Sequence, residues 1–226
     1  ARVNQSKELP YMYTVEGVEG VASLPGFMEG AFTVQDISSA LSVEAAGISA
    51  GDFYMDICAA PGGKTMLAAE KAAKVISRDV SEYKVALIAE NCDRMRLTDK
   101  VELQVWDATV LDEAYVEKAD VVLMDVPCSG LGVLGKNRDI KYNVTQESLE
   151  SLMQLQKQIV DSSWQYVKKG GTLLYSTCTI HRKENQKMCR FICENYPFEL
   201  EEERQILPGF TKADGFYYAR LRRIPC

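Results

Sequence analysis

Histidine is almost absent from this 226-residue sequence, in which His181 is the only one. Zinc sites are built mainly from cysteine and histidine at close spacings, and no two cysteines here form a CxxC pair. A single histidine, expected at the surface near a helix start, also leaves no Ser/His/Asp set to assemble. The sequence therefore predicts neither a metal site nor a histidine-dependent hydrolase.

Long apolar runs are also missing. No run approaches the ~18–20 residues that a membrane-spanning helix needs, and the first twenty residues lack the apolar core of a signal peptide. The cysteines number seven, and several lie in apolar segments, as buried free thiols do. We therefore expect a cytoplasmic monomer with reduced cysteines and no membrane contact.

Positive charge is in short supply, because the net charge is −6. This balance argues against nucleic-acid binding over the whole surface but leaves room for a local basic patch. Two basic clusters are present, Lys136, Arg138 and Lys141 and then Arg220, Arg222 and Arg223. On composition alone, each cluster could equally be an ordinary solvated face.

Strand-like and helix-like segments alternate from about Gly30 onward. The expected strands are 52–58, 74–79, 101–107, 119–125 and 172–177, and the tail 198–224 indicates two more around a loop. The expected helices are 64–73, 81–97, 146–169 and 183–196, with Ser81 as an N-cap and Gly170–Gly171 ending the third. This alternation predicts an α/β fold, a mostly parallel seven-stranded sheet with helices on both faces.

The first 29 residues differ from the rest. They contain "LPYM" and "LPGFMEG" and show little periodicity. We expect residues 1–29 to be the remnant of an N-terminal accessory region, distinct from the α/β domain of residues 30–226.

Acids and cysteines gather at the expected strand ends. They are Asp56, Asp79, Asp107, Asp125, Cys128 and Cys178. In parallel α/β sheets ligands bind beyond the carboxyl ends of the strands, so this pattern favours a site over scattered loop acids.

The loop "CAAPGGKT" (58–65) nearly matches the phosphate-binding pattern GxxxxGK[ST]. Cys58 replaces the first glycine, and Pro61 has no N–H to offer a phosphate. Asp79, about twenty residues on, is placed to accept ribose hydroxyls. Several acids without a phosphate loop favour S-adenosylmethionine as the cofactor, although the loop alone could be a tight packing turn.

Five motifs together carry a family resemblance: "DICAAPGGKT" (56–65), "DVPCSGLGVL" (125–134), "DIKY" (139–142), "YSTCTI…EN" (175–185) and "DGFYYARL" (214–221). With them, residues 20–226 resemble the RsmB-like, Sun/Nop2-type RNA cytosine-5 methyltransferases. The resemblance implies a Rossmann-like class I methyltransferase fold, S-adenosylmethionine as cofactor and a single-stranded or loop cytosine of small-subunit (16S) ribosomal RNA as target. It also implies that residues 1–29 are the remnant of an RNA-binding region and that residues 30–226 are the catalytic domain. Val126 departs from the family's usual alanine, and "GKNRDIKY" is less basic than its usual counterpart.

The resemblance also implies residue roles. Cys178 is the expected nucleophile toward carbon 6 of cytosine, and Cys128 is expected to assist release of the adduct. Asp125 would hold the cytosine edge, and Lys64 would lower a thiol pKa or hold the target phosphate. The expected cofactor residues are Cys58, Ala59, Ala60, Pro61, Gly62, Gly63, Lys64, Asp79, Asp107 and Asp125. The RNA candidates are Gln35, Lys136, Arg138, Lys141, Lys212 and Phe216.

Other functions were weighed against this one. DNA cytosine-5 methyltransferases take their nucleophile from the proline-cysteine motif and have no Thr-Cys partner, so Cys178 argues against them. A non-catalytic RNA-binding assembly factor would be expected to have degraded loop or cysteine motifs. A P-loop kinase is a remote fourth possibility, and either cysteine could be a packing thiol.

Overall fold

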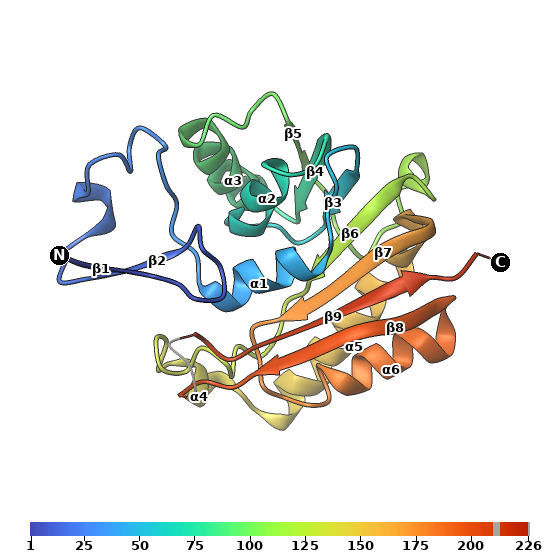
Figure 1. The fold of residues 1–226 in the computed structure, drawn as a ribbon. Helices are drawn as coiled ribbons and strands as arrows, with labels where there is room; N and C mark the ends of the chain where they lie inside the picture. Colours follow the sequence, from blue (N-terminus) through green and yellow to red (C-terminus); the bar gives the residue numbers. More distant parts are fainter. Residues whose placement is uncertain (210–212, 226) are drawn as a thin grey trace.

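A seven-stranded sheet forms the centre of the computed structural model, which describes residues 1–209 and 213–225 (Figure 1). Its strand order is β5-β4-β3-β6-β7-β9-β8. The strands are β3 (Phe53–Asp56), β4 (Lys74–Asp79), β5 (Val101–Val105), β6 (Ala119–Asp125), β7 (Val167–Thr177), β8 (Phe198–Ile206) and β9 (Phe216–Arg223). β9 pairs antiparallel with β7 and β8, and the other pairs are parallel. The predicted mostly parallel, seven-stranded sheet is confirmed.

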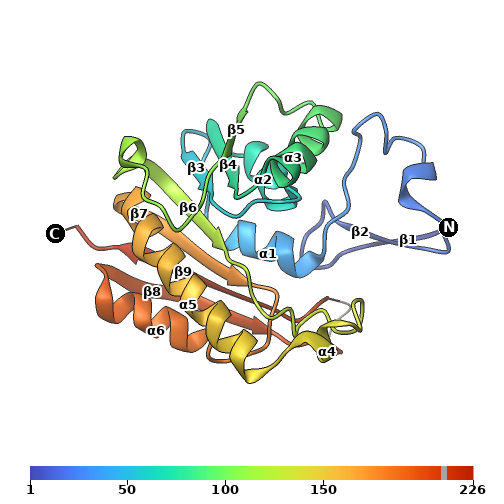
Figure 2. The same ribbon diagram turned by 180° about the vertical axis from the view of Figure 1, so that it is seen from behind.

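Helices cover both faces of this sheet. One face packs against α1 (Ile37–Ala45), α2 (Gly63–Ala69) and α3 (Glu82–Arg94), and the other against α5 (Gln146–Ser163) and α6 (Gln186–Asn195), which lie nearest the viewer in Figure 2. Side chains alternate along each strand, so Tyr54 joins the first core and Met55 the second. α4 (Ile140–Asn143) and the 3₁₀ turns Val21–Ser23, Glu113–Tyr115 and Trp164–Tyr166 complete the elements. No helix in the described ranges combines the length and apolar character needed to cross a bilayer.

Two local predictions from the sequence are wrong. The helix predicted over 146–169 ends at Ser163, and Gly170–Gly171 lie inside β7 rather than after a helix. Gly170 has φ +73° where the β6–β7 register shifts, so the glycine permits a bulge instead of ending a helix. α1 was not anticipated, because its three serines dilute the apolar period, although the Asp36 side chain caps its start.

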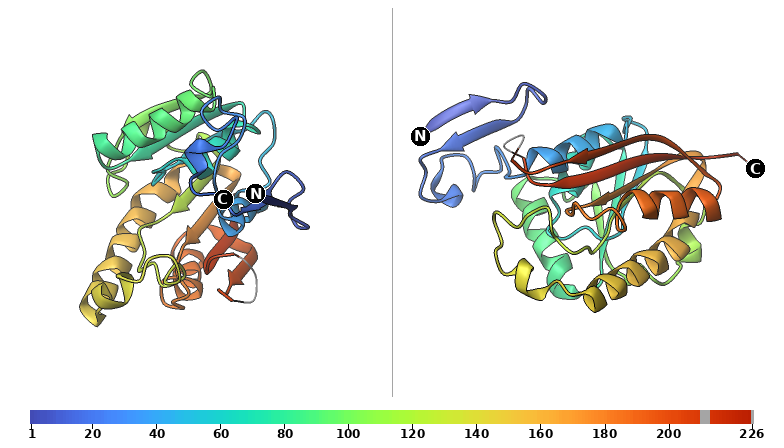
Figure 3. Two further views of the ribbon diagram at one scale, coloured as in Figure 1. Left: turned by 90° about the vertical axis from the view of Figure 1, so that its left-hand side faces the viewer. Right: turned by 90° about the horizontal axis from the view of Figure 1, so that it is seen from below.

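The chain begins with a short hairpin, and Leu9 from its turn is buried in the core of the main domain. β1 (Arg2–Gln5) pairs antiparallel with β2 (Tyr13–Glu16), and this hairpin lies beside the main sheet rather than in it (Figure 3). Arg94 of α3 ties the following segment down, donating hydrogen bonds of 2.9 Å to the carbonyls of Phe27 and Phe32. Its guanidinium also lies 4.1 Å from the centre of the Phe27 ring. The division at residue 30 stays a prediction.

The topology leaves a crevice in the middle of the sheet. From β3 the chain adds β4 and β5 on one side and then crosses to add β6 on the other. The loops after β3 and β6 therefore lead away from each other at the carboxyl edge. Such a switch point is where open α/β sheets bind their ligands.

Arg78 of β4 is a buried cation that contacts β5 and the segments after it. Its Nη2 donates to Asp112 Oδ2 at 2.6 Å and its Nε to Gln104 at 2.7 Å. The rings of Trp106, Tyr115 and Tyr166 surround the guanidinium. Asp112 thus compensates a charge that would be costly to bury alone.

Asp112→Asn is expected to lower the free energy of unfolding by about 3–5 kcal/mol, because it leaves the Arg78 cation buried without a counter-charge. Urea unfolding measures the change. The matched control is Glu8→Gln, which breaks the half-exposed pair with Arg204 (3.6 Å) and should cost no more than about 1 kcal/mol. Equal losses in the two variants would contradict this account of Arg78.

Asp56 ends β3 as a buried carboxylate beneath the glycine loop. Its Oδ2 accepts a 2.8 Å hydrogen bond from Thr65 of α2, whose hydroxyl also contacts Ser77 of β4 at 2.9 Å. Burial, opposed by the Thr65 hydrogen bond and reinforced by the nearby Asp125 charge, raises the pKa of Asp56 to about 7. The folded chain therefore holds a proton on Asp56 more tightly than the unfolded chain does.

This pKa shift makes stability fall between about pH 4 and pH 7, because the folded state holds a proton there that the unfolded state has already lost. Asp56→Asn cannot ionise, so its stability relative to the unmodified chain should rise through that window by up to ~1.4 kcal/mol per pH unit. Urea unfolding at pH 5.5 and pH 8 tests this. Asp99→Asn, at an exposed position, should show no such trend, and a pH-independent difference for Asp56→Asn would refute the shift.

Candidate active site

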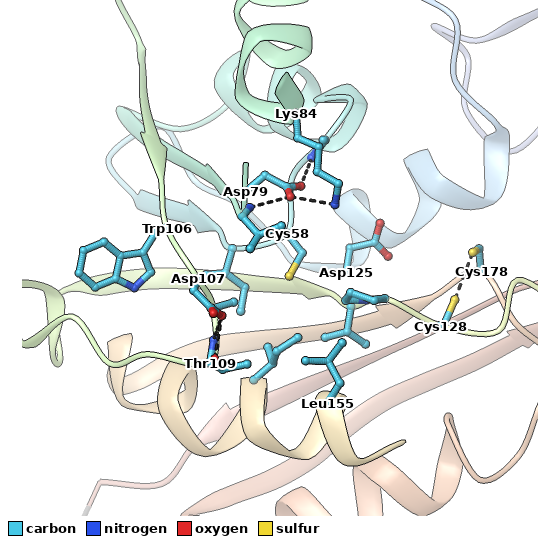
Figure 4. Close-up of a pocket in the computed structure, with 17 residues that line it drawn as sticks. Cys58, Asp79, Lys84, Trp106, Asp107, Thr109, Asp125, Cys128, Leu155 and Cys178 are labelled. Carbon is cyan, nitrogen blue, oxygen red and sulfur yellow. Dashed lines mark hydrogen bonds and ion pairs between the residues drawn. The ribbon is translucent and has the colours of Figure 1, made fainter. Parts of the chain in front are cut away.

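A cavity of about 300 Å³ opens at the switch point (Figure 4). Trp106 and Asp107 lie toward one end, and Cys128 and Cys178 lie at the other. The apolar floor comes from α5, where Leu155 and Ile159 point into the space. The cavity therefore joins three of the strand-end acids, Asp79, Asp107 and Asp125, and both predicted catalytic cysteines in one site, whereas Asp56 is buried outside its wall.

The glycine loop contributes its edge to this cavity rather than its whole length. Of the predicted cofactor residues, the cavity wall includes Cys58, Ala60, Asp79, Asp107 and Asp125. Gly62 has φ +101° and starts α2 with the chain packed against Ile88, so it shapes the turn. Ala59, Pro61, Gly63 and Lys64 also lie outside the wall and act through the loop's shape or through other contacts.

Asp79 fixes the loop from the end of β4. Its Oδ2 accepts from the Ala60 N–H at 2.9 Å, and its Oδ1 accepts from the Val80 N–H at 2.8 Å and pairs with Lys84 at 2.9 Å. These three contacts leave the carboxylate about one free acceptor position, which suits a ribose hydroxyl. Lys84, half-exposed, is a cavity residue that the sequence analysis missed.

The far end of the cavity follows β5. Asp107 Oδ1 accepts from the Thr109 N–H at 2.9 Å and from the Thr109 hydroxyl at 2.7 Å, and these two hydrogen bonds lower the Asp107 pKa. Trp106 lines the same end and packs on Arg78, 5.1 Å from its ring centre. Trp106 was not predicted, although its place directly after a strand was a usable signal.

Lys64 and Asp125 form an ion pair at the cysteine end. Lys64 Nζ lies 2.6 Å from Asp125 Oδ2, and the two side chains are 12% and 26% exposed. Asp125 Oδ1 accepts from the Ser176 hydroxyl of β7 at 2.7 Å. The ammonium also lies 5.0 Å from the centre of the Phe216 ring. Asp125 is thus held from both sides while it faces the cavity.

The two cysteine sulfurs are in contact. Cys128 Sγ and Cys178 Sγ are 3.2 Å apart, and both residues line the cavity. The hydrogen bond from Cys128 lowers the Cys178 pKa, helped by the Lys64 charge and opposed by burial and Asp125. The same contact, with burial, raises the pKa of Cys128 well above its ordinary value. These opposite shifts make Cys178 the more acidic thiol of the pair.

Lys136, a predicted RNA contact, has an exposed side chain that forms two ion pairs within the protein. Its ammonium lies 2.7 Å from Asp214 and 3.1 Å from Asp36. It therefore joins the loop after Cys128 to the start of α1 and to the segment before β9. Its charge is balanced by two carboxylates, which leaves little attraction for an RNA phosphate.

Among the other RNA candidates, some are exposed to solvent and others contact neighbouring residues of the protein. Arg138 and Lys141 are exposed, and Lys141 lies over the ring of its exposed neighbour Tyr142, 4.6 Å from its centre. Gln35 donates to the Ser39 hydroxyl at 3.0 Å. Phe216 is only 4% exposed, so its ring has no open face for a base. Lys212 lies outside the described residues.

The second basic cluster belongs to the sheet. Arg220 and Arg222 pair with Glu201 across β8 and β9, each at 3.0 Å, and Arg223 packs on Trp164. His181 is partly buried rather than at the surface, with Nδ1 3.3 Å from Glu184 Oε2. The described ranges show no group of three acids, cysteines or histidines arranged to hold a metal ion.

Comparison with known proteins agrees with this geometry. Residues 46–222 match the family model described as 16S rRNA methyltransferase RsmB/F. The chain is 37% identical over 212 residues to "Ribosomal RNA small subunit methyltransferase B" of Cronobacter sakazakii, covering 89% of the chain and 49% of that protein. Its counterpart in Vibrio vulnificus is 39% identical over 211 residues, with the same coverage. The chain thus spans about half the length of the curated relatives it matches.

Solved structures show the same fold. The crystal structure of PH0851 superposes with a TM-score of 0.91 at 30% identity, covering 97% of this chain and 53% of that one. NSun6 from Pyrococcus horikoshii, solved with SFG, superposes with a TM-score of 0.81 at 25% identity, covering 92% and 57%. A family match over most of the chain, together with the Rossmann-like sheet and its cavity at the switch point, shows that this chain belongs to the RsmB/F family of S-adenosylmethionine-dependent methyltransferases.

Proposed function

We propose that this chain methylates carbon 5 of a cytosine in RNA, with small-subunit ribosomal RNA as the substrate, through a covalent adduct between Cys178 and carbon 6. The observation that supports this most directly is the contact of two thiols, 3.2 Å apart, beside the Lys64–Asp125 pair. The family match supports the ribosomal RNA target. We infer that the protein acts as a monomer in the cytoplasm.

The cavity suits S-adenosylmethionine. Asp79 would accept hydrogen bonds from the ribose hydroxyls, and Trp106 with Asp107 would hold the adenine end. Pro61 and Cys58 deprive the loop of features that a triphosphate requires. When bound, the cofactor supplies the methyl group as an electrophile.

Cys178 makes cytosine reactive. Carbon 5 of the neutral ring is a weak nucleophile, and addition of a thiolate at carbon 6 turns the ring into an enamine whose electron pair is available at carbon 5. The lowered pKa of Cys178 increases the thiolate fraction near neutral pH. The nearby Lys64 ammonium contributes to this without touching the base.

Asp125 and Lys64 steady the charge that develops on the ring. The Asp125 carboxylate faces the cavity and can accept a hydrogen bond from the N4 amino group of cytosine, and from N3 once N3 carries a proton, while Ser176 and Lys64 fix its orientation. In a partly buried site such fixed charges act with little solvent screening. Asp125 therefore serves as both the recognition and the stabilising group.

Cys128 completes the reaction. After methyl transfer, the carbon-5 proton is lost to a base and the Cys178–carbon 6 bond breaks, which returns its electron pair to the sulfur. The Cys128 S–H, in contact with that sulfur, donates a hydrogen bond to the departing thiolate. The raised pKa of Cys128 keeps its proton available for this role.

The RNA has to present an unstacked cytosine, since the sulfurs lie inside a cavity. We propose that Arg138, Lys141 and the exposed ring of Tyr142 form the local contact surface next to the Cys128 loop. An aromatic ring beside two cations can stack on a base while the cations approach phosphates. Lys136 supports this surface from behind through its two carboxylates.

The two cysteine variants should fail differently. Cys178→Ala should neither methylate nor attach to RNA, because it lacks the attacking sulfur. Cys128→Ala should attach and transfer the methyl group, then release RNA slowly, with turnover reduced roughly 10²–10⁴-fold. A denaturing gel with substrate RNA and labelled S-adenosylmethionine shows the adduct as a slow, labelled band.

Cys193→Ala is the matched control, because this free cysteine lies on α6 away from the cavity. It should behave like the unmodified chain. A labelled band from Cys178→Ala alone would exchange the two roles. Full activity in both cysteine variants would rule out the covalent mechanism.

Calorimetry should show one S-adenosylmethionine bound per chain and no binding of ATP. Asp79→Ala should weaken binding by about 1.5–3 kcal/mol, the range for a hydrogen bond to a charged group. Asp99→Ala, at an exposed position outside the cavity wall, should leave the affinity unchanged. Binding of ATP without S-adenosylmethionine would overturn the cofactor assignment.

A further inference from the structure

Glu184 is a fully buried carboxylate that lies outside the cavity wall, just before α6. Its Oε1 accepts hydrogen bonds from the Ser129 N–H at 2.9 Å and from Gln156 Nε2 at 3.0 Å. Its Oε2 accepts from the Ser129 hydroxyl at 2.6 Å. Donors thus surround both oxygens, as a buried charge requires.

These contacts join the two cysteine loops. Ser129 follows Cys128, and its hydroxyl lies 2.8 Å from the hydroxyl of Thr179, which follows Cys178. The Glu184 carboxylate therefore binds Ser129 directly and is linked to Thr179 through the Ser129 hydroxyl. The 3.2 Å contact between the sulfurs lies directly beside this bridge.

Glu184 is itself held rigidly. Its carbonyl accepts from the Tyr175 hydroxyl of β7 at 2.8 Å, and its N–H donates to the His181 carbonyl at 3.0 Å. Gln156 of α5 donates both to Glu184 and, at 2.9 Å, to the carbonyl of Pro127. The bridge is thus anchored in β7 and α5, which gives it the stiffness that a positioning group needs.

We propose that Glu184 is a positioning residue that holds the Cys128 S–H against Cys178 and so sets the reactivity of the nucleophile. The proposal rests on the proposed function for its catalytic consequence, but its effect on Cys178 exists without RNA. Loss of the bridge would free residues 127–130 to move. The hydrogen bond from Cys128 that favours the Cys178 thiolate depends on the position of this segment. Cys178 also faces Asp125 and Lys64, which the substitution leaves unchanged.

The test measures Cys178 reactivity directly. The rate of alkylation by iodoacetamide is followed against pH on the folded chain without RNA, by mass spectrometry of the peptide that contains Cys178. Glu184→Ala should move the midpoint of the alkylation rate to higher pH, because the Cys178 thiolate loses the hydrogen bond from the Cys128 S–H. Glu184→Gln keeps an acceptor for the Ser129 N–H and should shift the midpoint less. In the methylation assay, kcat should fall roughly 10–100-fold with the KM for S-adenosylmethionine unchanged.

Ile192→Ala is the control for a purely structural effect, because it removes buried side-chain volume from α6 and should destabilise the fold. It should lower the melting temperature without moving the alkylation midpoint. An unchanged midpoint in both Glu184 variants, with only their melting temperatures lowered, would overturn the proposal. A shifted midpoint in a chain that methylates no RNA would refute the proposed function and leave the positioning role intact.

Discussion

The parallel register of β6 and β7 is the constraint on which the whole site depends. It sets Asp125 opposite Ser176, so the chain leaves the two strands at the same level of the sheet. Cys128 follows three residues after Asp125 and Cys178 two residues after Ser176. The hydrogen bonds from Val126 N–H to the Ser176 carbonyl and from Gly132 N–H to the Cys178 carbonyl then hold the departing loops together. A slip of one residue would turn these side chains to opposite faces.

Close packing of backbone around the cysteines explains why the contact is held. A Cβ at Gly132 would come within 1.9 Å of the Gly215 carbonyl oxygen, so the loop after Cys128 and the segment before β9 touch backbone to backbone. Lys136 adds an ionic contact from the same loop to Asp214. The Glu184 bridge closes the other side. Three independent restraints therefore surround a sulfur pair that has no covalent link.

Charge within the site is balanced locally, in a chain whose net charge is −6. Lys64 neutralises Asp125, and Lys84 neutralises Asp79, while the cavity itself keeps apolar walls from α5. Near such walls these charges interact more strongly than they would in water. The pKa values of the two cysteines are driven apart by their mutual hydrogen bond, which gives two identical side chains different acidities.

The sequence by itself determined the alternation of strands and helices, because side-chain periodicity can be followed along the chain. It also placed the acids and both cysteines at strand ends, because the motifs that contain them are local. It failed where long-range packing decided the outcome. Gly170–Gly171 were expected to end a helix and instead lie in a bulge of β7. The ion pairs of Lys136 and the burial of Phe216, two residues expected to contact RNA, could not be seen in the sequence. Lys84 and Trp106 were recognised as cavity residues only from the folded structure, although Trp106 directly follows a strand. Glu184 contacts Ser129 and Gln156, which lie far from it in the sequence, and only the folded sheet brings such partners within hydrogen-bond distance.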